Sequence, residues 1–200
     1  MRKVALLTVL AAIGILSIGA VAIADDDGGN GPNGARLNGY QEATSVSTTG
    51  FGSFHIKFNK NNTADYVLSY RDVETPVNQA HIHFAQRSVN GPVDVFLCRT
   101  TQPVPPGAQT APTCPPTIGT VSGRITPADI IAQAPDRGIE AGNWAEFKAA
   151  VKVGHTYANV HSTRFPGGEI RGQINDQDQR EYTGPPPFGT GGHGHDDDDD

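Results

Sequence analysis

The stretch NQAHIHFA, residues 78–85, alternates small or apolar residues with polar ones. Side chains of a β-strand point alternately to its two faces, so Ile82 and Phe84 share one face and His81 and His83 share the other. The stretch therefore predicts a strand that packs into a core on one side and carries a pair of histidines on the opposite side.

Two later segments repeat this alternation. Residues 155–161 place Ala158 and Val160 toward the core, and residues 169–174 place Ile170 there. If the three strands are neighbours, their non-core faces bring together Tyr157, Asn159, His161, Glu169, Arg171 and Gln173 beside the two histidines. Glu169 and Arg171 share a face with opposite charges, which predicts a partly buried ion pair.

Three interpretations of the polar face remain open from the residues alone. His81, His83 and His161 have the side chains of an open copper or zinc site. The same groups could instead form a structural hydrogen-bonded network with no metal, or a catalytic site without metal. A chelating set would bring the ring nitrogens within about 4 Å of one another. A network would bond each ring to the backbone, to Glu169 or to Arg171.

The remaining pattern predicts an all-β domain: an antiparallel β-sandwich, immunoglobulin-like or copper/zinc superoxide dismutase-like in architecture, with one or two short helices. Cap and first-turn residues place these helices after Thr126 and after Asn143. About seven short strands are expected, at residues 52–58, 64–70, 79–85, 93–97, 117–125, 155–161 and 169–174.

The two ends of the chain differ from its middle in composition and are not expected to belong to the folded domain. Residues 1–24 carry a basic start, an apolar run and an A-x-A cleavage site, the layout of a secretory signal peptide. Residues 25–34 are read as a flexible leader, residues 35–175 as the folded domain, and residues 176–200 as a disordered Pro/Gly-rich acidic tail. A secreted or periplasmic protein follows, with no membrane span after cleavage.

The net charge and the cysteine content limit the possible partners and predict one covalent cross-link. The formal net charge of −6 comes with no basic patch, so a nucleic-acid partner is excluded. Cys98 and Cys114 are the only two cysteines, and in an oxidising compartment they are expected to form a disulfide. The tail segment 192–195, GHGH before five aspartates, is read as solvating rather than as a metal ligand set.

Several motifs together resemble the CHRD domain family. Its A-H-I-H segment, its G-P-V turn before an apolar strand, and its closing motif Y-x-N-V-H-[ST]-x-x-x-P-x-G-E-I-R-G-Q match Ala80–His83, Gly91–Val93 and Tyr157–Gln173. LNGYQEA, residues 37–43, looks like the opening strand of that family. The resemblance covers about residues 35–175 and implies a β-sandwich in an extracellular or periplasmic setting.

Two departures accompany the resemblance. Many relatives have a glycine soon after the H-x-H segment, where this chain has Phe84-Ala85-Gln86, so the turn is expected around Ser88–Gly91 instead. The loop between Cys98 and Cys114 looks like an insertion. A weaker similarity to copper/zinc superoxide dismutase rests on the H-x-H segment alone and carries architecture, not activity.

We therefore expect an exported, non-catalytic binding or structural module with an extracellular protein or glycan partner. The alternative is a periplasmic or extracellular copper or zinc protein that uses His81, His83 and His161.

Overall fold

The computed structural model describes residues 33–100, 110–133 and 138–175. The predicted signal peptide, most of the leader and the predicted tail lie outside these residues. The regular elements are β1 (Gly34–Asn38), η1 (Gly39–Gln41), β2 (Phe51–Phe58), β3 (Ala64–Arg71), β4 (Val77–Phe84), β5 (Val93–Arg99), β6 (Gly119–Ile125), η2 (Pro127–Asp129), α1 (Trp144–Lys152), β7 (Thr156–Ser162) and β8 (Ile170–Ile174).

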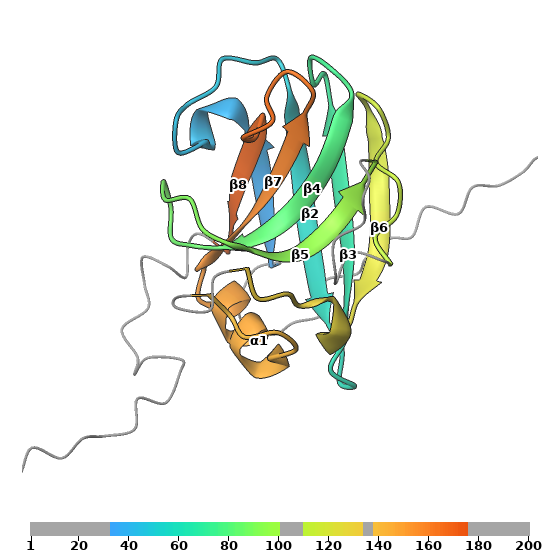
Figure 1. Ribbon diagram of the computed structural model, residues 1–200, viewed down its shortest axis with the longest axis vertical. Coiled ribbons are helices and arrows are strands. Elements are labelled where there is room, and N and C mark those ends of the chain that lie inside the picture. The colour runs from blue at the N-terminus through green and yellow to red at the C-terminus, as the bar shows by residue number, and fades with distance from the viewer. Residues whose placement is uncertain (1–32, 101–109, 134–137, 176–200) are drawn as a thin grey trace, which may run out of the picture.

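All eight strands belong to one sheet with the order β5-β4-β7-β8-β1-β2-β3-β6, and every neighbouring pair is antiparallel. The sheet curls so that β4 and β5 cross in front of β2 and β3 (Figure 1). The prediction of an all-β antiparallel fold is confirmed. Its division into the two separate sheets of a sandwich is not, because hydrogen bonds connect all the strands into one nearly closed sheet.

The space inside the curled sheet is filled by the apolar faces of its strands. Phe54, Leu68, Ile82 and Ile170 are fully buried there and belong to one continuous cluster. Each of these residues lies at the parity that alternation assigns to the core. Burial of this apolar surface is the main force that closes the sheet.

Helix α1 lies across one end of the sheet (Figure 1). Its start follows the predicted cap, because Asn143 Oδ1 accepts a hydrogen bond from the backbone N–H of Glu146 at 3.2 Å. Trp144 and Phe147 face the sheet, and both rings contact Phe58 edge-on. The helix predicted after Thr126 is one 3-10 turn, η2. No helix in the described part of the chain is long and apolar enough to cross a membrane.

The opening of the domain differs from expectation. Residues 37–43 were expected to form the first strand, but β1 ends at Asn38 and η1 follows directly. Asn38 explains the change, since its side chain accepts a hydrogen bond from the N–H of Gln41 and caps the turn. The prediction placed this strand too late.

Cys98 and Cys114 form the predicted disulfide. It joins the end of β5 to the segment before β6, which are consecutive strands at opposite ends of the sheet order. The bond closes a loop over a sequence separation of 16 residues.

Replacing both cysteines with alanine should lower the free energy of unfolding by about 3 kcal/mol, because the unfolded chain regains the entropy of the closed loop. Urea unfolding of the Cys98→Ala/Cys114→Ala variant beside the wild type measures this loss. The reduced wild type is the matched control and should lose a similar amount. Equal stability of oxidised wild type and variant would contradict the prediction.

Candidate metal centre

The three histidines singled out by their parity lie side by side on two neighbouring strands. Strand β4 supplies His81 and His83, and strand β7 supplies His161. In the antiparallel register His81 is opposite Asn159 and His83 is opposite Tyr157. The exposed fraction of the histidines is only 3% to 7%, so the polar face is covered rather than open to solvent.

Two loops cover this face. One connects β4 to β5, and Arg171 Nη2 holds it by donating to the carbonyl oxygens of Gln86 and Val89 at 3.2 and 2.9 Å. The turn of this loop includes Ser88, which has a positive φ, within the region expected from the sequence. The other loop connects β7 to β8 and reaches His161 through Pro166.

Hydrogen bonds to backbone carbonyls fix the tautomers of two of the rings. His83 Nδ1 lies 3.0 Å from the carbonyl oxygen of Gly91, and His161 Nδ1 lies 2.9 Å from that of Pro166. Only an N–H can donate to a carbonyl oxygen, so Nδ1 is protonated in both rings. In the neutral ring the lone pair then resides on Nε2. This is the arrangement in which protein histidines bind metals, with the second ring nitrogen bonded to a carbonyl group.

The third ring completes the cluster. His81 Nδ1 lies 3.2 Å from His161 Nε2, so the Nδ1–H of His81 donates to the His161 lone pair. The lone pair of His81 is then on Nε2. Neither His81 Nε2 nor His83 Nε2 has a hydrogen-bond partner in the described structure, although both atoms are buried. Unpaired buried lone pairs of this kind are costly and uncommon in folded proteins.

Burial keeps all three imidazoles neutral. It lowers the pKa of His83 to about 4, the pKa of His161 below its usual value, and the pKa of His81 well below it. The neighbouring histidines lower the pKa of His81 further. Neutral imidazole is the metal-binding form, and the site provides it without competition from protons.

The cluster has nearly the dimensions of a chelating site. One nitrogen from each ring can be chosen so that all three lie within 4.8 Å of one another. Nitrogens bound to one tetrahedral Zn²⁺ at ~2.0–2.1 Å lie about 3.4 Å apart. The His81–His161 contact already meets the 4 Å criterion, and the full set would have to close by about 1.4 Å. Neither criterion is met in full, because the set of three nitrogens exceeds 4 Å and only His83 and His161 bond to backbone carbonyls.

Aromatic side chains form the walls of the cluster. The Phe96 ring contacts His81 edge-on with centroids 4.5 Å apart. Tyr157 stacks parallel on His83 with ring centroids 4.6 Å apart, and the guanidinium carbon of Arg171 lies 3.4 Å from the centroid of the Tyr157 ring. The Arg171 cation is attracted to the Tyr157 ring, and its charge adds to burial in lowering the pKa of His83.

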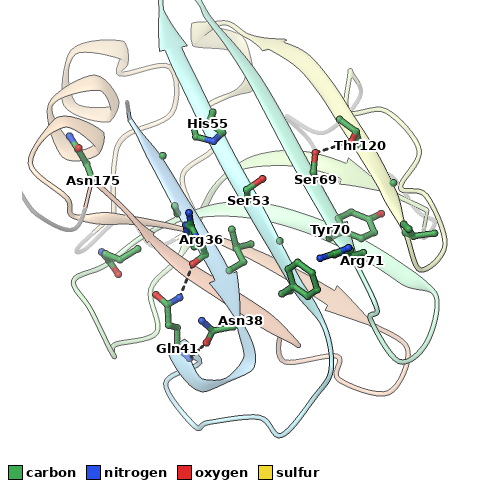
Figure 2. Close-up of a pocket in the computed structure, with 18 residues that line it drawn as sticks. Arg36, Asn38, Gln41, Ser53, His55, Ser69, Tyr70, Arg71, Thr120 and Asn175 are labelled. Carbon is green, nitrogen blue, oxygen red and sulfur yellow. Dashed lines mark hydrogen bonds between the residues drawn. The ribbon is translucent and has the colours of Figure 1, made fainter. Parts of the chain in front are cut away.

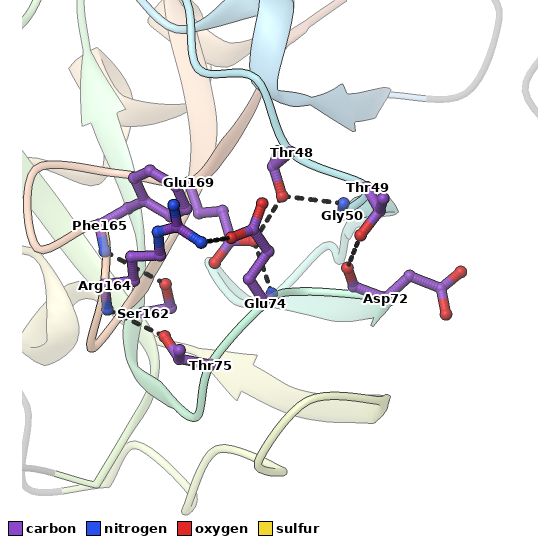
Figure 3. A network of polar contacts seen from close by, with 10 residues as sticks. All are labelled: Thr48, Thr49, Gly50, Asp72, Glu74, Thr75, Ser162, Arg164, Phe165 and Glu169. Carbon is purple, nitrogen blue, oxygen red and sulfur yellow. Dashed lines mark hydrogen bonds and ion pairs between the residues drawn. The ribbon is translucent and has the colours of Figure 1, made fainter.

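The predicted ion pair between Glu169 and Arg171 is wrong. Arg171 faces the histidine side, where its partners are carbonyl oxygens, Asn90 and the Tyr157 ring. Glu169 contacts a different part of the molecule: Oε1 accepts hydrogen bonds from Thr48 Oγ1 at 2.7 Å and from the N–H of Glu74 at 2.8 Å (Figure 3). Position 169 lies just before β8 begins, so strand parity does not apply to it.

Asn159 lies on the polar face, as predicted, and it contacts Glu42, a residue that the parity argument missed. Its Nδ2 donates to Glu42 Oε1 at 2.6 Å, and Glu42 is 9% exposed. Burial raises the pKa of Glu42 to about 7, although the charge of Arg171 and the Asn159 bond lower it. The only sequence signal was a charged residue inside the motif at residues 37–43.

Asp94 is a second residue that sequence reasoning missed. It is 1% exposed, its Oδ2 has no hydrogen-bond partner among the described residues, and burial raises its pKa to about 8. It lies between Val93 and Val95, where the pairing of β4 with β5 changes register. An acidic residue between two valines was the available signal.

Comparison with known proteins gives one match. A family model described as CHRD domain matches residues 34–174, which run from the first residue of β1 to the last of β8. No curated protein and no solved structure matches the chain.

Replacing Glu42 with glutamine should remove a pH-dependent loss of stability. The pKa of this carboxyl is raised in the folded protein, so the folded state binds the proton more tightly than the unfolded chain. Wild type should therefore lose stability relative to Glu42→Gln as the pH rises from about 4.5 to about 7. Urea unfolding of both proteins across this range measures the difference, and a difference independent of pH would contradict the assignment.

Proposed function

This chain belongs to the CHRD domain family, and on that premise we propose that it is an exported, non-catalytic domain that binds one copper or zinc ion. The ligands are His81, His83 and His161. The observation that carries the proposal is the pair of buried, unpartnered lone pairs on His81 Nε2 and His83 Nε2, within a cluster whose ligand atoms lie within 4.8 Å of one another.

A metal ion would satisfy what the protein groups leave unsatisfied. His83 and His161 carry their lone pairs on Nε2, because their Nδ1–H groups are bonded to Gly91 and Pro166, and a metal ion on His161 Nε2 would replace the hydrogen bond from His81. His81 offers Nε2, or Nδ1 after its proton moves. Three imidazoles without a thiolate or carboxylate suit copper and zinc better than magnesium or calcium, which prefer oxygen ligands.

Burial supports a binding or structural role over catalysis. The histidines are at most 7% exposed under the two covering loops, so a substrate could not reach the ion without moving them. An ion shared by His83 and His161 would link β4 to β7 and add to the stability of the covered face.

Export is supported by two features of the chain. Residues 1–24 have the composition of a secretory signal peptide. The Cys98–Cys114 disulfide is the kind of bond that persists in oxidising compartments such as the periplasm or the extracellular space.

Adding Zn²⁺ or Cu²⁺ to metal-free mature protein should raise its melting temperature. Binding to the folded state alone adds about 2.7 kcal/mol at a free metal concentration of 100 Kd. For a chain of this size, that corresponds to roughly 5–10 °C. Calorimetric titration should give one tight site, and His81→Ala/His83→Ala should abolish it.

Two controls separate this site from other histidines. His193→Ala/His195→Ala removes the tail imidazoles and should leave the tight site intact. His155→Ala removes an imidazole that does not belong to the cluster and should also leave the tight site intact. If the cluster variant and wild type bind the same amount of metal, the histidines form a hydrogen-bonded network without metal, and the proposal fails.

A further inference from the structure

A groove of about 1070 Å³ runs over the outer face of a different part of the sheet. Its floor is formed by β1, β2, β3 and the start of β6, as Figure 2 shows. Strand alternation explains part of its lining: Ser53 and His55 line the groove, while Phe54 between them is buried in the core. The groove is independent of the metal proposed for the histidine cluster.

The lining of the groove is cationic, although the chain as a whole is acidic. It contains Arg36 and Arg71 and no aspartate or glutamate, whereas the chain carries a net charge of −6. Within the described residues, the Arg36 guanidinium has no hydrogen-bond or ion-pair partner. Arg71 has only a 4.0 Å contact with the exposed carboxylate of Asp72, a weak pair in water.

Two of the exposed large apolar residues also line this groove. Phe51 is 38% exposed and Ile118 is 65% exposed. The guanidinium of Arg71 lies 4.0 Å over the Phe51 ring, so charge and apolar surface are adjacent. An occupant that combines carboxylates with a few apolar side chains would match both features.

The chain itself supplies such a segment at the rim of the groove. Asn175 lines the groove and is the last described residue. Its side chain is anchored to Asn33 and to the carbonyl oxygen of Lys152, so the next residues leave from a fixed point. Residues 176–200 contain eight acidic residues, one arginine and Phe188.

We propose that the acidic segment 176–200 of this chain binds in the groove, with Asp196–Asp200 next to Arg36 and Arg71. The run begins 21 residues after Asn175, and a random-coil chain of that length spans about 25 Å on average. Four strands spaced ~4.8 Å apart extend about 15 Å, so the run reaches every part of the groove. A tether of this kind gives the segment a local concentration of the order of millimolar.

The test compares amide NMR spectra of the ¹⁵N-labelled mature protein with those of a variant carrying asparagine at positions 196–200. The amide signals of Arg36, Ser53, His55 and Arg71 should differ between the two. At about 1 M salt, where charges are screened beyond ~3 Å, the difference should disappear. A synthetic peptide of residues 176–200, added to the asparagine variant, should move the signals back toward the wild-type positions.

A charge-reversal variant and a second acidic run provide the controls. In the asparagine background, Arg36→Glu/Arg71→Glu should weaken binding of the added peptide at least about fivefold. Neutralising Asp25–Asp27 in the wild-type protein should leave the groove signals unchanged.

The proposal is overturned if the wild-type and asparagine-variant spectra coincide at the groove, or if only the Asp25–Asp27 variant changes them. It is also overturned if both proteins bind polygalacturonate with equal Kd, since an external polyanion would then enter a groove that the tail does not occupy.

Discussion

Strands β4, β7 and β8 are covered on both faces, and much of the structure follows from that constraint. One face packs into the apolar core, and the other carries histidines, an arginine and amide side chains that are also removed from water. Each buried polar group without a partner costs a sizeable part of a domain's small net stability. The covering loops therefore have a second function: Gly91, Val89 and Pro166 supply the carbonyl oxygens that this face requires.

Alternation of residues was enough to predict which side chains share the polar face. His81, His83, Tyr157, Asn159, His161 and Arg171 all lie where parity places them, because each is inside a regular strand. The argument failed where regular strand geometry ends. Glu169 precedes β8, the opening strand stops at a cap made by Asn38, and Asp94 lies at a change of register. Contacts between segments distant in the sequence, such as Asn159 with Glu42, leave no periodic signal.

The pattern of the sequence also could not predict that all the strands join into one sheet. Seven or eight short antiparallel strands are compatible with two packed sheets or with one curled sheet. The choice depends on which strands form hydrogen bonds, and the deciding step is the pairing of β1 with β8, which joins the halves by a single register position, Asn38 with Arg171. The resemblance to the CHRD family implied a β-sandwich and did not predict this topology.

The way in which the sheet ends has a consequence for the protein's behaviour in a crowded compartment. Strand β5 is last in the order, yet its edge is occupied: Arg99 N–H bonds to Pro112, Ile131 N–H bonds to the Asp94 carbonyl oxygen, and Tyr66 donates to the Leu97 carbonyl oxygen. The disulfide fixes the segment that contains Pro112 in place. An open edge would let strands of other molecules pair with it and assemble into fibrils. The covered edge of β5 does not offer its backbone groups for such pairing.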